Sequence, residues 1–299
     1  MTGTKPIVGL IGVGEMGQPM GLNLMRAGLA LVAYDIRPEA LVEVKKNGAR
    51  IATSPLDVAN SSDIIISILP NSKIVMDALV EGKNSALPGI SERHTVIEMS
   101  TLDVDTTLEL EKLIKEKGGA FIDAPISGVP EKVKTRDIII LASGEKSTVD
   151  NSMEVLNALG KTVEYIGQAG KGKVMKLVNN MLVATHKIAA TEAICYALKN
   201  GIDPAILFKV IGEASGSSDV FMRYGPVVVR DDKGVSNKHS WHSKDLRLIN
   251  EECNKLGIPL VMGSLSYQIT QTAANDSGGV ENFGSLIKLY KKIMKLEVD

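Results

Sequence analysis

The segment Gly12-Val13-Gly14-Glu15-Met16-Gly17 decides the fold of this chain. It follows the short apolar run Ile7–Ile11 and opens an amphipathic stretch that reaches Gly28. Between a strand and a helix, this glycine spacing permits a tight turn, a close backbone approach to a pyrophosphate and close packing of the helix on the strand. The context predicts a dinucleotide-binding βαβ unit whose helix N-terminus faces the phosphates. The alternative is an ordinary glycine-rich turn.

The next apolar run ends in the residue that is expected to select the cofactor. Asp35 directly follows the run Leu29–Tyr34 and lies 18 positions after Gly17. This is close to the usual spacing of about 20 residues between the glycine motif and the acid that binds the adenosine ribose hydroxyls. A carboxylate there repels a 2′-phosphate, whereas Arg37 could pair with one or could be a solvated surface residue. We predict NAD as the cofactor, with NADP as the alternative.

Strand-like and helix-like segments alternate through the first part of the chain. Short β-branched runs are separated by amphipathic stretches that are long enough for helical crossovers. These runs are Ile7–Ile11, Leu29–Tyr34, Asp63–Leu69, Thr95–Met99, Ala120–Asp123, Ile138–Ala142 and Thr162–Ile166. They are apolar on both faces, as strands of a parallel sheet covered by helices are. The pattern predicts a doubly wound α/β sheet of the Rossmann type, forming a dinucleotide-binding domain over residues 1–166.

After Gly167 the pattern changes. Lys173–Lys199 is a long helical stretch with too many polar residues for a lipid-exposed span, and Asp203-Pro204 marks the start of another helix. Almost no strand-like alternation remains. We therefore predict an all-α C-terminal domain over residues 167–299, joined through the long helix and serving substrate binding and oligomerisation.

Composition and charge exclude several classes of protein. Hydrophobic residues make up 44% and charged residues 23% of the 299 positions, as in ordinary globular chains. Lys and Arg number 34 against 35 for Asp and Glu, so no global field attracts nucleic acid or an anionic membrane. Cys195 and Cys253 are too few for a disulfide framework or a four-thiolate zinc site. With no export signal visible, we expect a cytoplasmic protein with reduced thiols.

The motifs resemble those of a known family. The segment Gly9–Met20 resembles the opening motif of the β-hydroxyacid dehydrogenases, which include 3-hydroxyisobutyrate dehydrogenases and tartronate semialdehyde reductases. Further matches follow in order over nearly the whole chain. They are Leu69-Pro70-Asn71, Glu98-Met99-Ser100-Thr101, Asp123-Ala124-Pro125-Ile126-Ser127-Gly128, Gly170-x-Gly172-x-x-x-Lys176-x-x-Asn179-Asn180 and Lys244-Asp245-Leu246. NADP-using members typically carry an Asn-Arg-Thr type sequence at Asp35-Ile36-Arg37, so the resemblance also favours NAD.

The resemblance implies that Lys176 is the catalytic general acid and base. Burial or a nearby cation can lower the pKa of a lysine toward the working pH. Asn180, four residues on, shares a helix face with Lys176 and is predicted to hold the amine or the substrate. Without the resemblance, Lys176 would be interpreted as an exposed helix lysine, although the preceding Gly170 and Gly172 favour a site.

The same resemblance implies the binding residues. Ser127-Gly128 follows a strand, where α/β proteins bind ligands, and is assigned to the substrate carboxylate; the alternative is a simple turn. Leu69, Pro70 and Asn71, with Ser100 and Thr101, are expected to flank the ribose and nicotinamide. Lys244 is expected to contact substrate and cofactor and to help lower the pKa of Lys176, unless it forms only a surface pair with Asp245.

Two segments depart from the family pattern. Where relatives usually continue Gly-x-x-Gly-Ala-x-x-Gly-Thr-Leu, this chain has side chains at every aligned glycine between 129 and 137, so we expect a differently shaped loop. Lys132, Lys134 and Arg136 could favour a doubly anionic substrate, although a solvated charge run is the favoured interpretation. In the second segment Trp241 is expected to line the substrate pocket. His239 and His242 have no identifiable third ligand, so no metal site is predicted.

These observations predict an NAD-dependent oxidoreductase that interconverts a small 3-hydroxy acid and its semialdehyde or keto acid. One alternative is an NADPH-dependent reductase of the glyoxylate or succinic semialdehyde type. Another is a non-catalytic dinucleotide-binding regulator, against which Lys176 and Asn180 argue. A homodimer or homotetramer is expected from the resemblance, whereas the exact substrate and the number of subunits stay open.

Overall fold

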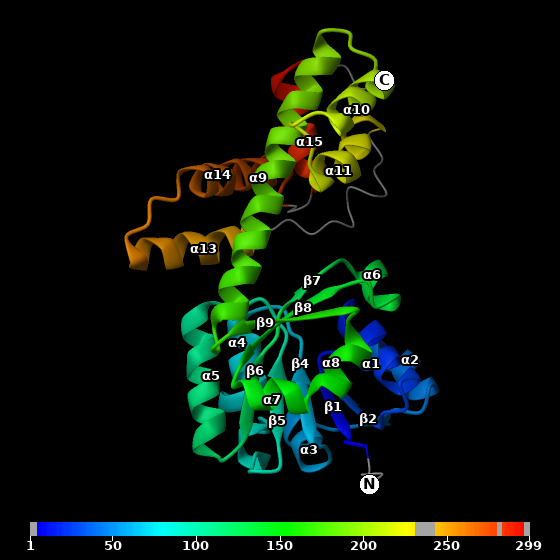
Figure 1. Ribbon diagram of the computed structural model, residues 1–299, viewed down its shortest axis with the longest axis vertical. Helices are drawn as coiled ribbons and strands as arrows, with labels where there is room; N and C mark the ends of the chain where they lie inside the picture. Colours follow the sequence, from blue (N-terminus) through cyan, green and yellow to red (C-terminus); the bar gives the residue numbers. More distant parts are fainter. Residues whose placement is uncertain (1–4, 231–242, 280–282, 296–299) are drawn as a thin grey trace. The chain divides into compact units, whose positions relative to one another are not determined.

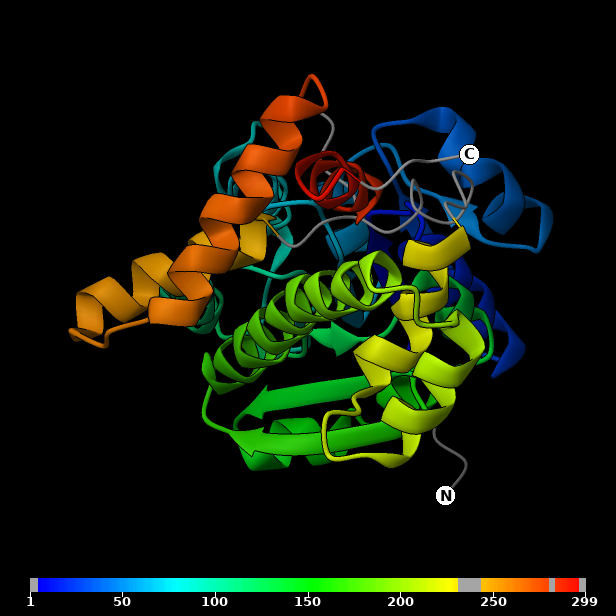
Figure 2. The same ribbon diagram turned by 90° about the horizontal axis from the view of Figure 1, so that it is seen from above.

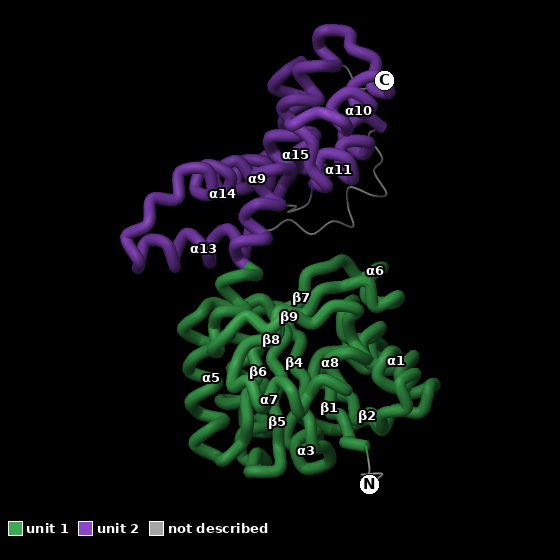
Figure 3. Tube along the Cα trace, in the orientation of Figure 1, with its two compact units in different colours: residues 1–176 green, residues 177–299 purple. Residues whose placement is uncertain are grey.

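The computed structural model describes residues 5–230, 243–279 and 283–295 (Figure 1). They form two compact units, Met1–Lys176 and Leu177–Asp299 (Figure 3). The division falls inside the long helix α9 (Lys171–Lys199), whereas the sequence suggested a boundary ahead of that helix. Backbone groups in the first turn of α9 bond to side chains of the sheet, which places the start of the helix in the first unit.

The first unit is built on one sheet of nine strands. The strands are β1 (Val8–Ile11), β2 (Leu31–Tyr34), β3 (Arg50–Ile51), β4 (Ile64–Ser67), β5 (Thr95–Glu98), β6 (Ala120–Asp123), β7 (Ile126–Ser127), β8 (Ile139–Gly144) and β9 (Thr162–Gly167). Their order is β3-β2-β1-β4-β5-β6-β8-β7, with β9 beside β8. The doubly wound sheet is confirmed. The two-residue strands β3 and β7 were not predicted, because two residues show no alternation.

One part of the sheet reverses direction. Strands β1 to β6 pair in parallel, with Ile11 opposite both Tyr34 and Ser67 in the register of β1 with β2 and β4. Strand β8 runs antiparallel to β6 and β7 and parallel to β9. The sheet is therefore mostly parallel rather than wholly so, because a run of buried residues carries no information about strand direction.

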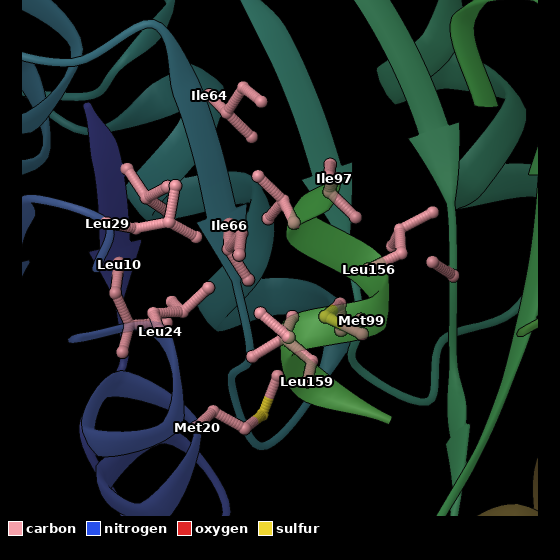
Figure 4. Close-up of a cluster of buried hydrophobic side chains, with 14 of the residues drawn as sticks. Leu10, Met20, Leu24, Leu29, Ile64, Ile66, Ile97, Met99, Leu156 and Leu159 are labelled. Carbon is pink, nitrogen blue, oxygen red and sulfur yellow. The ribbon is translucent and has the colours of Figure 1, made fainter. Parts of the chain in front are cut away.

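Helices cover both faces of the sheet, and each face has its own core. One core joins alternate strand residues such as Leu10, Ile66 and Ile97 to Leu24 and Leu156 on the covering helices (Figure 4). These helices are α1 (Gly17–Arg26), α2 (Val42–Lys46), α6 (Pro130–Lys134), α7 (Lys146–Asn151) and α8 (Met153–Leu159). The opposite face is covered by α3 (Pro55–Asn60), α4 (Ser72–Met76) and α5 (Val104–Glu116). Short helical turns lie at Pro38–Leu41, Asp77–Glu81 and Leu87–Gly89.

In its described residues the second unit is entirely helical, as predicted. It contains the rest of α9 with α10 (Pro204–Glu213), α11 (Asp219–Arg230), α13 (Ser243–Leu256), α14 (Val261–Asp276) and α15 (Phe283–Ile293). Helices α10 and α11 lie beside the C-terminal half of α9 in both views (Figures 1 and 2). Asp203 caps α10 by accepting the N–H groups of Ala205 and Ile206 at 2.9 and 3.2 Å. Within the described residues, no helix has the length and apolar character needed to cross a membrane.

Candidate active site

The glycine loop between β1 and α1 has the shape that a dinucleotide requires. Gly12 has a φ of +99°, and a Cβ at this position would lie 2.3 Å from the carbonyl oxygen of Ile68. A Cβ on Gly17 would lie 1.9 Å from the carbonyl oxygen of Gly12, so neither glycine can be replaced without moving the backbone. The first helical hydrogen bond of α1 runs from the Gln18 N–H to the Gly14 carbonyl. The N–H groups just before Gln18 therefore have no acceptor within the helix, and such groups at a helix N-terminus can bind a pyrophosphate.

Asp35 lies at the carboxyl end of β2 and contacts this loop. Its carboxylate accepts the Val13 N–H at 2.8 Å and the Arg37 backbone and Nε groups at 2.9 and 3.1 Å. Burial opposes ionisation of Asp35, but the hydrogen bonds from Arg37 and Val13 outweigh it and lower the pKa. An ionised acceptor of this kind fits ribose hydroxyls. The guanidinium of Arg37 lies 3.3 Å from the Cβ that Gly14 lacks, so it also borders the loop.

The residues after β4 and β5 are tied to one another. Ser100 accepts the Leu69 N–H on its hydroxyl at 2.8 Å and donates its own N–H to Glu98 Oε1 at 2.8 Å. Asn71 accepts the Ile74 N–H at 3.0 Å as the N-cap of α4. Ser100 and Asn71 were predicted to flank the cofactor, and their hydrogen bonds also fix the backbone of these loops. The motifs alone do not reveal this structural role.

Ser127 and Gly128 lie where β7 ends. Ser127 is half-buried opposite Ile139, and its hydroxyl has no hydrogen-bond partner among the described residues. A Cβ on Gly128 would lie 2.4 Å from Ile138 Cγ2, so close packing against β8 also explains this glycine. The Ser127 hydroxyl is thus available to a ligand.

The following segment, in which the family glycines are replaced, forms the short helix α6 and packs against α1. The carbonyl of buried Val133 accepts the side-chain amide of Asn23 at 2.7 Å. Lys132 forms an ion pair with Asp137 at 3.0 Å, and Arg136 adopts a φ of +60°. The engagement of Lys132 with a surface carboxylate supports the interpretation of this segment as a solvated charge run.

Lys176 and Asn180 lie one turn apart on α9. Lys176 is half-buried, and Asn180 is only 3% exposed. The Asn180 side-chain amide donates to Asp245 Oδ2 at 2.7 Å, and Lys244 Nζ lies 3.7 Å from Asp245 Oδ1. The second unit therefore brings Asn180, Lys244 and Asp245 together. The motif match located Asn180 and Lys244, but it did not reveal that Asp245 orients the Asn180 amide.

Sequence reasoning missed a buried charge cluster around Lys173. The Lys173 ammonium lies 2.6 Å from Glu98 Oε2 and 2.8 Å from Asp123 Oδ1, and all three side chains are inaccessible to solvent. Burial disfavours the ammonium, but Asp123 and Glu98 outweigh that effect and raise the pKa of Lys173. The available signal was an acidic residue at the end of each of two largely apolar strands, because a buried carboxylate at such a position requires a partner.

Three residues that the sequence analysis singled out, His239, Trp241 and His242, lie outside the described residues. Among the described residues, no group of three or more His, Cys, Asp or Glu side chains is arranged to hold a metal ion.

Known proteins resemble this chain over almost its whole length. Residues 7–167 match the family model described as the NAD binding domain of 6-phosphogluconate dehydrogenase. Residues 170–290 match the model described as NAD-binding of NADP-dependent 3-hydroxyisobutyrate dehydrogenase. The mitochondrial 3-hydroxyisobutyrate dehydrogenase of Rattus norvegicus is 32% identical, and the alignment covers 97% of this chain and 88% of that protein.

Two further relatives agree with this assignment. The 2-(hydroxymethyl)glutarate dehydrogenase of Eubacterium barkeri is 28% identical over 97% of each chain. The structure of Mycobacterium tuberculosis 3-hydroxyisobutyrate dehydrogenase with L-serine superposes with a TM-score of 0.86 at 26% identity, over 96% of this chain and 99% of that one. The fold of both units is thus shared with a known member of this group. This chain is a member of the β-hydroxyacid dehydrogenase family, whose enzymes are NAD(P)-dependent oxidoreductases of hydroxy acids.

Proposed function

We propose that this protein interconverts a small 3-hydroxy acid and its semialdehyde or keto acid, with Lys176 as the general acid and base. The observation that carries the proposal is the place of Lys176 on α9, one turn before an Asn180 amide that Asp245 holds in one orientation. The names of the relatives support a hydroxy-acid substrate. A dinucleotide-binding regulator without turnover would have no use for this arrangement.

Each residue has a defined task in the reaction. When bound, the nicotinamide supplies the hydride acceptor for oxidation and the donor for reduction. The neutral amine of Lys176 accepts the hydroxyl proton during oxidation, and its ammonium returns that proton during reduction. Asn180 holds the Lys176 amine or the substrate by hydrogen bonds. The Ser127 hydroxyl and the Gly128 N–H bind the substrate carboxylate, and Lys244 adds a cation that favours it.

We propose NAD as the preferred cofactor. The ionised carboxylate of Asp35 repels a 2′-phosphate, and it holds the Arg37 guanidinium in an ion pair at 3.1 Å. The second candidate, an NADPH-dependent reductase of small aldehydes such as glyoxylate or succinic semialdehyde, is favoured by the place of Arg37 beside Gly14. Released from Asp35, Arg37 would be the residue that meets the additional phosphate. Turnover rates with NAD and NADP decide between the two.

We also propose that the protein is a homo-oligomer, a dimer or a tetramer, in a reducing compartment such as the cytosol. Large apolar side chains on α10 and α14 are exposed, among them Ile206 at 59%, Val261 at 74% and Met262 at 61%. Apolar surface of this extent in one small unit favours burial against a second copy. Cys195 and Cys253 are both buried free thiols, which supports the reducing compartment.

The decisive experiment follows reduced-nicotinamide absorbance with NAD or NADP and a panel of 3-hydroxy acids. The panel contains hydroxyisobutyrate, glycerate, serine, threonate and dicarboxylic hydroxy acids. Lys176→Met removes the proton acceptor and keeps the side-chain length, whereas Lys171→Met changes an exposed lysine at the start of the same helix and serves as the control. We expect turnover to be lost in Lys176→Met and retained in Lys171→Met. Turnover that persists in Lys176→Met excludes this lysine as the base, and NAD binding without turnover across the panel supports the regulator.

A further inference from the structure

The buried ammonium of Lys173 lies where three parts of the first unit meet. It donates to Glu98 Oε2 at 2.6 Å and to the Ser100 carbonyl at 2.7 Å, both at the end of β5. It lies 2.8 Å from Asp123 Oδ1, the last residue of β6. An ammonium carries three N–H groups and no acceptor, and its third hydrogen bond goes to the Glu98 carbonyl at 3.3 Å, while Asp123 Oδ1 contributes an ion pair. No neutral side chain of similar length offers three donors from one atom.

On the strand side, this ammonium holds the Ser100-Thr101 turn, which the family resemblance leads us to expect beside the nicotinamide. Glu98 accepts the Ser100 N–H on its second oxygen at 2.8 Å, while Lys173 binds the carbonyl of the same residue. The Ser100 hydroxyl in turn accepts the Leu69 N–H at 2.8 Å. The orientation of the Ser100-Thr101 turn and of the loop after β4 therefore depends on Lys173 and Glu98 together.

On the helix side, the cluster fastens the first turn of α9. Asp123 Oδ2 accepts the N–H groups of Gly170 and Lys173 at 3.1 and 3.2 Å, and it accepts the Ser143 hydroxyl at 2.8 Å. The Gly172 N–H donates to that same hydroxyl at 3.0 Å. A Cβ on Gly172 would lie 2.6 Å from the Leu141 carbonyl oxygen, so the start of the helix is pressed onto β8. These contacts hold the first turn of α9 in place on the sheet.

We infer that Lys173 is a positioning residue, whose ammonium sets the place of Lys176 relative to the Ser100-Thr101 turn. The inference rests on the proposed function, in which Lys176 acts on a substrate beside the cofactor. Lys176 follows Lys173 by three residues on α9, and side chains at this spacing are neighbours with Cβ atoms about 5–6 Å apart. The same ammonium thus contacts both the Ser100-Thr101 turn and Asp123, which holds the first turn of α9 ahead of Lys176.

The test uses a variant that removes the link and leaves the formal net charge of the cluster unchanged at −1, since one ammonium and one carboxylate are removed together. Lys173→Met alone leaves two buried carboxylates and can unfold the protein, so it is combined with Glu98→Gln. The remaining Asp123 carboxylate keeps its bonds from Gly170 and Ser143. Lys171→Met, on the exposed side of the same helical turn, is the matched control. Circular dichroism and thermal melting establish the folded fraction to which all rates are normalised.

We expect kcat of the folded double variant to fall about tenfold to a hundredfold, because displacement of a catalytic group by about 1 Å has effects of this size. The KM for the hydroxy acid is expected to change less than about twofold, because Ser127 and Gly128 are not part of the cluster. The control is expected to keep the wild-type values. Unchanged kcat per folded site overturns the inference. A rise in KM that accounts for the whole loss also overturns it, because a disturbed fold impairs binding and chemistry alike.

Hydrogen exchange gives a measurement that does not depend on turnover. In the folded double variant, amides in the first turns of α9 and at residues 100–102 are expected to exchange faster together, while those of α1 keep their rates. If the wild-type protein turns over no hydroxy acid, the proposed function is wrong and this measurement alone decides the role of Lys173. Exchange at the wild-type rate in both segments overturns the inference.

Discussion

Helix α9 buries one lysine near its start and another near its middle, and the surroundings shift the pKa values of the two side chains in opposite directions. Lys173 is 0% exposed among carboxylates, and Asp123 and Glu98 raise its pKa. Lys187 is 1% exposed, with its ammonium 4.4 Å from the ring centroid of Tyr224 and 5.4 Å from that of Phe283. Burial, with a smaller effect from Arg223, lowers the pKa of Lys187 to about 8. Depth of burial alone therefore does not decide the direction in which the pKa of a lysine moves, because the carboxylates around Lys173 reverse it.

The largest effect is expected from breaking the cluster at Lys173. Lys173→Met leaves Glu98 and Asp123 buried without the ammonium, and losing one partner of a buried ion pair destabilises a protein by about 3–5 kcal/mol. We expect a large drop in the free energy of unfolding, measured by urea titration with far-UV circular dichroism. Adding Glu98→Gln should restore much of that stability. A single variant that is as stable as wild type would show that the carboxylates do not need this lysine.

Replacing Lys187 is expected to raise the free energy of unfolding rather than lower it. Methionine keeps the volume of the side chain and removes the cost of burying an ammonium, while it gives up cation–π attraction of about 1–2 kcal/mol. Because a depressed lysine pKa of about 8 means that the fold disfavours the charge at neutral pH, we expect Lys187→Met to stabilise the protein by roughly 1 kcal/mol. A lower urea midpoint at pH 7 would mean that contacts of the ammonium outweigh its burial.

The smallest expected effect is the change in stability with pH that Lys187 causes. Below pH 8, Lys187 is protonated in both the folded and the unfolded state, so the full cost of burying the charge is present. Between about 8 and the ordinary lysine pKa of 10.5 the unfolded state binds more protons, so the free energy of unfolding rises with pH. From pH 8 to 9 we expect Lys187 to add up to about 1 kcal/mol, seen as a rising Tm that is absent in Lys187→Met. Equal slopes in the two proteins would contradict this pKa.

The parts of the fold that were predicted correctly are those governed by neighbours along the chain. The glycine spacing from Gly12 to Gly17, the apolar runs of the seven longer strands and the capping pair Asp203-Pro204 each depend on local backbone geometry. The direction of β8 and the existence of β7 depend instead on which strand lies alongside. A pattern of buried residues reads the same in either direction, so single-sequence reasoning could not supply them.

The candidate site divides in the same way. Lys176, Asn180 and Ser127 were identified because they belong to motifs, and their places at strand ends and on α9 follow from the chain order. The partners of these residues were not identified. Asp245 orients Asn180 from 65 residues away, and Lys173 reaches Glu98 across 75 residues, distances at which sequence spacing carries no contact information.

The sequence by itself determined the class of this protein. The glycine loop and the acid at the end of the second run indicate a dinucleotide-binding fold, because phosphate and ribose each require a particular residue type at a particular local position. The resemblance of the motifs to those of the β-hydroxyacid dehydrogenases implies the hydroxy-acid chemistry. Only the tertiary structure decided how Lys173 and Lys187 differ. Both lie on α9, and the electrostatics of each depend on side chains that folding brings from distant strands and helices.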